Sequence, residues 1–294
     1  NYTYGQSEQP GEQPIRVLYR EINIIIGKAI KAVEKDYPER LRDIEFNYNI
    51  GNEKISGPRA SEKRITIDES FLSFLWTYCN GLITGPINLF PNMCPENHKA
   101  VQMLDYARDL FRGYRVWDKT NLPNPELHNK CISIRMTNTF FLVGVHLIIC
   151  HEMGHYILGH TKKNPKTREE SIVWEYEADN FAIRYTQILK ETASTKTINT
   201  GMTVAICALT FAKKNLTGGA RHPDPYDRIS NLLESLALDE TDLCWATAMW
   251  SYFEWISRVG KTKWPETIDP KNIKKSFYMV KALVDSVNRE EQGT

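Results

Sequence analysis

The sequence predicts a mainly α-helical protein of the α+β class, with a small β element near the N-terminus and a helical segment at the C-terminus. Apolar residues recur at helical spacing through most of the chain. Short runs suited to strands are confined to residues 44–67. The 294 residues suffice for a large buried core. We therefore expect a flexible lead over residues 1–14, one main domain over 15–240 and a helical extension over 241–294.

Apolar spacing and turn residues define the expected N-terminal elements. Ile22, Ile26 and Val33 recur at helical spacing, and apolar and polar residues alternate after Ile44. Prolines predict loops within residues 84–97 and 113–130. The expected elements, in chain order, are a helix over 15–42, strands over 44–50 and 64–67 with a turn at 57–58 between them, and helices over 71–82 and 98–111.

The second half of the chain is predicted to be helical. Thr137 or Asn138 is expected to cap a long helix that ends near His160, and Thr167 to cap the next helix. The break between these two helices falls at residues 161–165, which include a proline. Further helices are expected over 198–214, 226–238, 243–259 and 273–287.

Composition and charge disfavour several function classes. The formal net charge is +1, so the bulk electrostatics call for neither nucleic acid nor an anionic membrane as a partner. The longest apolar stretch, residues 140–150, is shorter than a bilayer, and we expect no membrane span. The six cysteines show no CxxC spacing, which argues against a zinc ribbon or a redox pair. Free buried thiols in a reducing compartment fit this pattern, and we expect a cytoplasmic protein.

The sequence His151-Glu152-Met153-Gly154-His155 has HExxH spacing. Residues four apart lie on one face of a helix, so both imidazoles can bind one metal ion. Imidazole is a good zinc ligand, and we expect Zn²⁺ as the cofactor. Glu152 would then accept a proton from the metal-activated water as the general base. The alternative is an exposed amphipathic helix with two surface histidines, and the strongly apolar residues before the motif argue against it.

Glu175 is the expected third metal ligand. The break after the first long helix would let the second helix return and bring Glu175 to the metal. Asp179 lies one turn further on the same face, where it can accept the second N–H of a ligand imidazole. Glu177 is expected to point elsewhere, as a surface or salt-bridge residue. His160 is expected to pack or cap the helix end, away from the face of His155. A solvated acidic patch is the alternative for Glu175, because other glutamates are nearby.

Three stretches together resemble a known group of metallopeptidases. HEMGHYILGHTKKN begins at His151, EYEAD at Glu175 and HPDPYDR at His222. In this order they resemble the motifs of the CAAX prenyl endopeptidase and HtpX group. The resemblance implies a gluzincin, with Glu175 as metal ligand beside the two histidines of HExxH. It also implies that His222 stabilises the oxyanion and that Arg228 supports the site.

The roles of the last motif stay open from the residues alone. His222 could instead be a turn residue before Pro223. Arg228 could pair with Asp224 or with carboxylates near Glu175.

The resemblance covers only the catalytic core, roughly residues 140–232. Members of the CAAX and HtpX group are integral membrane proteins, and a prenylated substrate is not implied for a chain without a span. A weaker resemblance, in size, solubility and the HExxH motif, is to the phage-exclusion Lit peptidase group. That resemblance implies a cytosolic protease acting on a translation factor.

These observations predict a zinc-dependent endopeptidase of zincin-like fold that acts on a protein or peptide substrate. In such folds an edge strand binds the substrate backbone, and residues 44–50 or 64–67 are the candidates. One alternative is a latent cytosolic protease of toxin or antiviral type, controlled by an activating or inhibitory protein partner. Another is a non-catalytic binding module stabilised by zinc. Glu152 argues against the binding module, because a structural zinc has no use for a general base.

Overall fold

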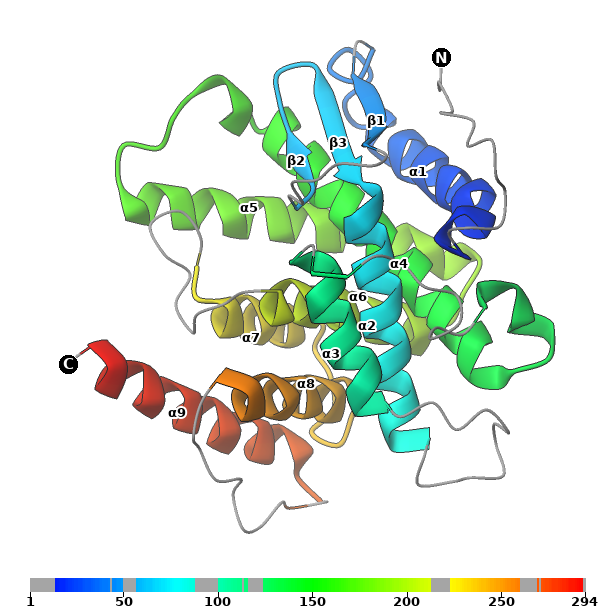
Figure 1. The fold of residues 1–294 in the computed structure, drawn as a ribbon. Helices are drawn as coiled ribbons and strands as arrows, with labels where there is room; N and C mark the ends of the chain where they lie inside the picture. The colour runs from blue at the N-terminus through cyan, green and yellow to red at the C-terminus, as the bar shows by residue number, and fades with distance from the viewer. Residues whose placement is uncertain are drawn as a thin grey trace.

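Helices dominate the protein and three short strands form a small sheet, as the computed structural model in Figure 1 shows. The structure describes residues 14–42, 44–49, 57–87, 100–112, 114–115, 124–212, 223–259, 269 and 271–292. The elements in chain order are η1 (Pro14–Leu18), α1 (Tyr19–Glu34), β1 (Glu45–Asn49), β2 (Arg59–Ala60), β3 (Arg64–Asp68), α2 (Glu69–Ile87), α3 (Ala100–Phe111), η3 (Pro125–Asn129), α4 (Ile132–Ile157), η4 (His160–Lys162), α5 (Arg168–Thr186), η5 (Gln187–Glu191), α6 (Thr195–Phe211), α7 (Pro225–Ser235), α8 (Leu243–Val259) and α9 (Ile273–Gln292). The predicted class, mainly α-helical with a small N-terminal β element, is confirmed.

The longest of these helices, α4, is largely buried. Helices α1, α2, α5 and α6 pack against it, and Phe141, Leu147 and Ile149 are among its core side chains. Among the described residues, α4 is also the one helix long and apolar enough to cross a membrane by length and composition. Because 67% of its most apolar window is buried inside the protein, this composition suits a core helix and is weak evidence for a span. The cytoplasmic location stays a prediction.

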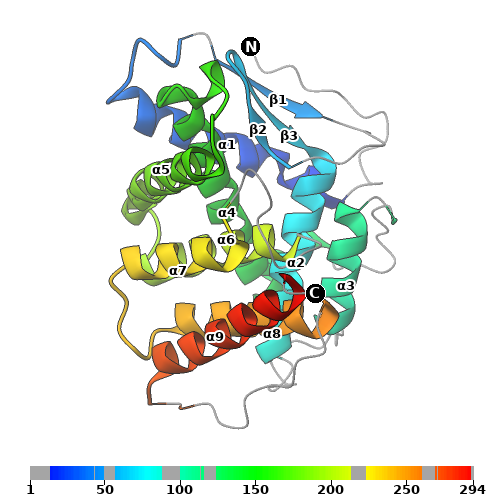
Figure 2. The same cartoon turned by 90° about the vertical axis from the view of Figure 1, so that its left-hand side faces the viewer.

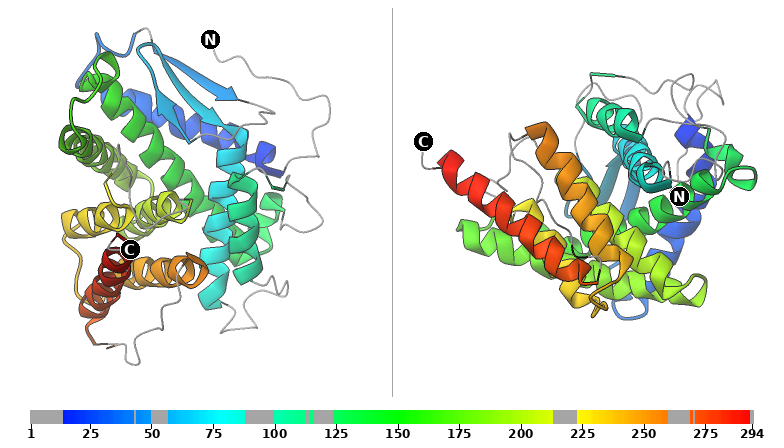
Figure 3. Two further views of the ribbon diagram at one scale, coloured as in Figure 1. Left: turned by 60° about the vertical axis from the view of Figure 1, so that its left-hand side comes forward. Right: turned by 90° about the horizontal axis from the view of Figure 1, so that it is seen from below.

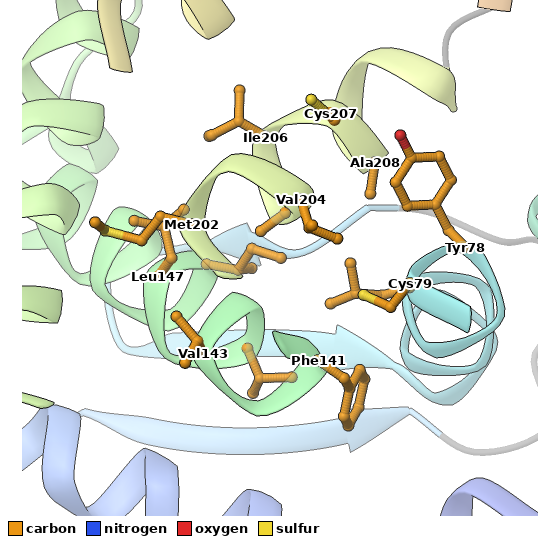
Figure 4. Close-up of a cluster of buried hydrophobic side chains, with 14 of the residues drawn as sticks. Tyr78, Cys79, Phe141, Val143, Leu147, Met202, Val204, Ile206, Cys207 and Ala208 are labelled. Carbon is orange, nitrogen blue, oxygen red and sulfur yellow. The ribbon is translucent and has the colours of Figure 1, made fainter. Parts of the chain in front are cut away.

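Close packing of α2, α4 and α6 forms the centre of the core. In Figure 4, Cys79 of α2, Phe141 and Val143 of α4 and Val204 of α6 gather between the three helices. A Cβ added at Gly201 of α6 would lie 2.6 Å from Val143 Cβ. Glycine is therefore required for α6 to lie this close to α4.

The sheet has the strand order β1-β3-β2, with β1 parallel and β2 antiparallel to β3. The strand over Arg64–Asp68 is central, so the expectation that residues 64–67 form an edge for substrate is wrong. β1 forms one edge, and β2, which contacts α4, forms the other. The sequence does not reveal β2, because a strand of two residues is too short to show alternation.

The start of α4 differs from the expected one. The helix begins at Ile132 with Cys131 at its N-cap, so the cap predicted at Thr137 or Asn138 is wrong. Both polar side chains are buried within the helix and bond to α2 instead. Asn138 Oδ1, for example, accepts a hydrogen bond of 2.8 Å from Trp76 Nε1.

Of the other predicted helix boundaries, one is confirmed and one lies further along the chain than expected. The cap at Thr167 is confirmed, because its hydroxyl accepts a hydrogen bond of 3.2 Å from the backbone N–H of Glu170. α2 continues to Ile87, past the expected end near residue 82. Residues 1–13 of the expected lead and residues 88–97 of the expected loop lie outside the described residues.

The C-terminal helices α8 and α9 lie side by side at the end of the protein opposite the sheet (Figures 2 and 3). α8 packs on α6, and the buried hydroxyl groups of Tyr78 and Ser251 lie 2.6 Å apart. Tyr252 Oη also donates a hydrogen bond of 2.7 Å to the backbone carbonyl of Tyr226. These contacts join the expected extension to the core, and the division near residue 240 stays a prediction.

Candidate metal centre and cleft

The last turns of α4 bring both histidines of the HExxH sequence to one face. The Nε2 atoms of His151 and His155 lie 3.1 Å apart. The ring centroids are 4.7 Å apart, with an angle of 85° between the ring planes. Their spacing along the helix produces this approach, because residues one turn apart lie above one another.

Helix α5 brings Glu175 to the same point. Glu175 Oε2 lies 3.7 Å from His151 Nε2, and Oε1 lies 3.7 Å from His155 Nε2. One ligand atom from each of the three residues lies within 4.8 Å of the others. α5 can come this close because Gly154 has no side chain, and a Cβ there would lie 3.2 Å from Ala178 Cα.

Asp179 and Arg228 lie behind His151. Asp179 Oδ1 is 2.9 Å from His151 Nδ1. From α7, Arg228 Nε donates to Asp179 Oδ2 at 2.8 Å and Nη2 donates to Oδ1 at 2.6 Å. Arg228 Nη1 also lies 3.6 Å from Glu175 Oε2. The sequence left two possible partners for Arg228, Asp224 or the carboxylates near Glu175, and the structure shows the pairing with the carboxylates near Glu175.

The charges of this group support one another. Burial alone would raise the pKa of Asp179, but Arg228 and His151 outweigh it and hold the pKa at about 2. Burial alone would lower the pKa of His151, but the hydrogen bond and charge of Asp179 raise it. Arg228 behaves in the same way, because Asp179 raises its pKa against the effect of burial. The carboxylate and the guanidinium are therefore both charged near neutral pH.

His155 has a different partner, His160. Their Nδ1 atoms lie 3.0 Å apart, and His160 Nε2 lies 3.0 Å from Glu177 Oε2. The His160 ring stacks on Trp174, with centroids 4.9 Å apart and an angle of 3° between the planes. Burial lowers the pKa of His155 to about 3 and also lowers that of His160. Both imidazoles are therefore neutral near neutral pH.

The contact between His160 and His155 differs from the expectation that these residues face apart. The physical reason is Gly159, whose φ of 81° turns the chain at the end of α4 and returns His160 toward the helix. Glu177 agrees with its expected role as a surface or salt-bridge residue, because its side chain is half exposed and contacts His160. The sequence does contain a signal, because a glycine that ends a helix predicts a left-handed turn.

Glu152 lies in the wall of a cleft of about 570 Å³ beside the two histidines. Its side chain is buried, and burial raises the pKa of the carboxyl group although the charge of His151 opposes this. The backbone N–H of Ala60, in the edge strand β2, donates a hydrogen bond to the Glu152 carboxylate. Apolar side chains line much of the cleft, among them Phe71, Phe111, Leu147, Ile148, Ile206 and Leu209.

His222 lies outside the described residues, so its role stays a prediction. The described chain resumes at Pro223, just before α7.

The donor set fits a zinc ion. His151 and His155 each turn Nδ1 toward an outer partner, which leaves their Nε2 atoms directed at Glu175. Two imidazole lone pairs and a carboxylate are all electron-pair donors, so a cation at their meeting point would satisfy all three. Two histidines and a glutamate are a ligand set that catalytic zinc uses, with one position left for water or substrate.

Comparison with known proteins gives the class of protein. A sequence model of the family described as Peptidase U49 matches residues 65–248. The match covers more than half of the chain and spans every candidate site residue from His151 to Arg228, so the chain belongs to the Peptidase U49 family and is a peptidase. This is a Lit-type metallopeptidase family, which agrees with the second resemblance noted in the sequence, while the relation to the CAAX group stays a prediction. Neither a curated protein nor a solved structure matches the chain.

Proposed function

We propose that the protein is a zinc-dependent endopeptidase that hydrolyses peptide bonds of a protein substrate. The main support for this proposal is that His151, His155 and Glu175 converge, with potential ligand atoms within 4.8 Å of one another. Membership of a peptidase family supports a hydrolytic reaction. Hydrolysis needs a group that removes a proton from water, and Glu152 lies beside the ligands in the same cleft.

Zinc, when bound, would polarise the substrate carbonyl and lower the pKa of a water molecule. Glu152 would take a proton from that water on a carboxylate oxygen as the water oxygen bonds to the carbonyl carbon. It would pass this proton to the amide nitrogen as the C–N bond breaks and the amine leaves. Burial raises the pKa of Glu152, which makes its carboxylate a stronger proton acceptor than an exposed one. Asp179 would hold His151 in its orientation, and Arg228 would hold Asp179. His222 would donate to the substrate carbonyl oxygen.

The edge strand β2 is the proposed docking site for the substrate backbone. Arg59 and Ala60 line the cleft together with Glu152. An extended peptide can add to such an edge through main-chain hydrogen bonds. The substrate class is therefore an extended or locally unfolded segment of a protein, placed by β2 across the metal ligands. A cytoplasmic location, without a nucleic-acid partner, is part of the same proposal.

Replacing Glu152 by glutamine tests the mechanism. The amide keeps the shape of the side chain but cannot take the proton, so we expect the rate to fall about 10²- to 10⁴-fold. Bound metal would be measured by elemental analysis of both purified proteins. Cleavage would be measured by a proteome-wide search for new N-termini in a lysate. We expect equal zinc contents and new termini with the wild type alone.

Each other outcome has a definite meaning. Full activity of Glu152→Gln would exclude Glu152 as the base. Zinc in both proteins without new termini would favour a latent protease that needs an activating partner, or a zinc-stabilised binding module. Absence of zinc from both would contradict the proposed metal centre.

A further inference from the structure

The contacts behind His155 fix a consistent set of proton positions. His155 can offer its Nε2 lone pair to a metal as a neutral ring only if its proton is on Nδ1. That Nδ1 lies 3.0 Å from His160 Nδ1, which must then be the acceptor. The proton of His160 is thereby on Nε2, which donates to Glu177 Oε2 at 3.0 Å. One tautomer of each ring thus satisfies both contacts.

The His160 ring is held in place from two sides. It stacks on Trp174 with nearly parallel planes, and its side chain is only 7% exposed. The left-handed turn at Gly159 sets the direction from which His160 approaches the end of α4. A ring held in this way can restrict the orientation of its hydrogen-bonded neighbour, His155.

We propose that His160 is a positioning residue that accepts the Nδ1 proton of His155 and, with Glu177, fixes the tautomer and orientation in which His155 binds the metal. The inference rests on the proposed zinc centre and deepens it. It assigns to His155 an outer support that corresponds to the Asp179 carboxylate behind His151, with a neutral imidazole in the place of the carboxylate.

Two other roles for His160 make different predictions. A fourth metal ligand would direct a ring nitrogen at the point between His151 and Glu175, whereas the nitrogens of His160 face His155 and Glu177. A ring that only packs against Trp174 could be exchanged for another flat ring without weakening metal binding. An experiment must therefore distinguish a His160 ring that only packs against Trp174 from one that accepts the proton of His155.

The variants His160→Phe and His160→Asn separate stacking from hydrogen bonding. Phenylalanine keeps a flat ring against Trp174 but has no acceptor, whereas asparagine can place an oxygen near the position of Nδ1 without a ring. Zinc affinity of the purified full chain would be measured by competition with a chromophoric chelator. The visible spectrum of the Co²⁺-loaded protein would report the ligand geometry. We expect His160→Phe to weaken zinc binding about 10- to 100-fold and to change the cobalt spectrum. His160→Asn should regain most of the lost affinity.

A second pair of variants gives an answer even if His160→Phe does not fold. Glu177→Ala and Glu169→Ala each remove an exposed carboxylate from α5, but only Glu177 contacts His160. We expect Glu177→Ala to weaken zinc binding by roughly tenfold, the lower end of the range for outer partners of a metal ligand. Glu169→Ala should bind zinc as the wild type does.

The outcomes distinguish this inference from the proposed function. Unchanged zinc affinity in His160→Phe, or in Glu177→Ala, would overturn the inference and leave the zinc centre intact. Asparagine no better than phenylalanine would also overturn it, because an acceptor would then fail to restore the site. A wild-type protein that binds no zinc would overturn the proposed function itself, and this inference with it.

Discussion

The two histidines of the candidate metal centre are held from behind in different ways. His151 contacts the carboxylate of Asp179, which Arg228 holds with two hydrogen bonds. His155 contacts the neutral imidazole of His160, whose own partner is a glutamate at the surface. The Asp179 and Arg228 side chains are 5% and 10% exposed, whereas that glutamate is 50% exposed. The network of Asp179 and Arg228 behind His151 is therefore charged and buried. The network behind His155 consists of the neutral imidazole of His160 and the exposed carboxylate of Glu177.

This difference separates what each network stabilises. Charges taken out of water cost several kcal/mol unless they are paired, so Asp179 and Arg228 need each other for the fold to be stable. The network behind His155 buries no charge and ends at an exposed carboxylate, where ion pairing contributes little. We expect the first network to affect both the free energy of unfolding and metal binding. The second should affect metal binding alone.

Replacing Arg228 by methionine should have the largest effect. The change leaves the buried carboxylate of Asp179 without its guanidinium, and Glu175 nearby loses the same positive charge. The free energy of unfolding of the metal-free protein should fall by about 3–5 kcal/mol. Urea unfolding measures this loss. Glu177→Ala is the matched change in the other network and should cost less than about 0.5 kcal/mol. Equal losses in the two variants would contradict the comparison.

Much of the fold and the convergence of the candidate metal ligands can be predicted from the sequence because both follow from local spacing. HExxH places His151 and His155 on one face of any helix that contains them. Glu175 needs one further assumption, that the chain returns after α4, and the proline and the cap at Thr167 indicate where it does. The structure brings these three side chains together.

The features that helical and strand spacing alone did not predict depend on contacts between distant segments or on a single turn. Arg59–Ala60 is a strand only because it pairs with Ile65 and Thr66 of β3. Asn138 resembles a helix cap in sequence, yet its side chain bonds to α2 across the core. His160 reaches His155 through a left-handed turn, which spacing along an ideal helix does not contain.

A third histidine on α4, His146, offers a comparison that shows how far Asp179 determines the charge of His151. His146 is fully buried, with Nδ1 at 3.3 Å from Thr186 Oγ1 and 3.5 Å from Cys150 Sγ. Burial lowers its pKa to about 4, whereas Asp179 raises that of His151. In the unfolded chain the pKa of His146 is about 6.5. At pH values between about 4 and about 6.5, His146 is therefore protonated in the unfolded chain but not in the folded protein. Protonation therefore favours unfolding as the pH falls.

His146→Gln should remove that dependence. The wild type should lose roughly 3 kcal/mol relative to the variant as the pH falls from about 7 to about 4. Urea unfolding at a series of pH values measures the difference, in which the other histidines cancel. Parallel curves for the two proteins would mean that His146 carries its charge in the folded state or titrates normally.

The smallest expected effect concerns the distance between α4 and α5, on which both networks depend because α5 carries Asp179 and Glu177. A Cβ at Gly154 would lie 3.2 Å from both Ala178 Cα and Phe181 Cβ, so Gly154→Ala must push the helices apart. We expect a net loss of about 1 kcal/mol, because the strain exceeds the gain in helix propensity. Gly27→Ala in α1 is the control, since its Cβ meets nothing within 4 Å, and it should stabilise the protein by about 0.5–1 kcal/mol. Thermal unfolding compares the two. If both changes stabilised the protein equally, the close approach of α5 to α4 would not constrain the site.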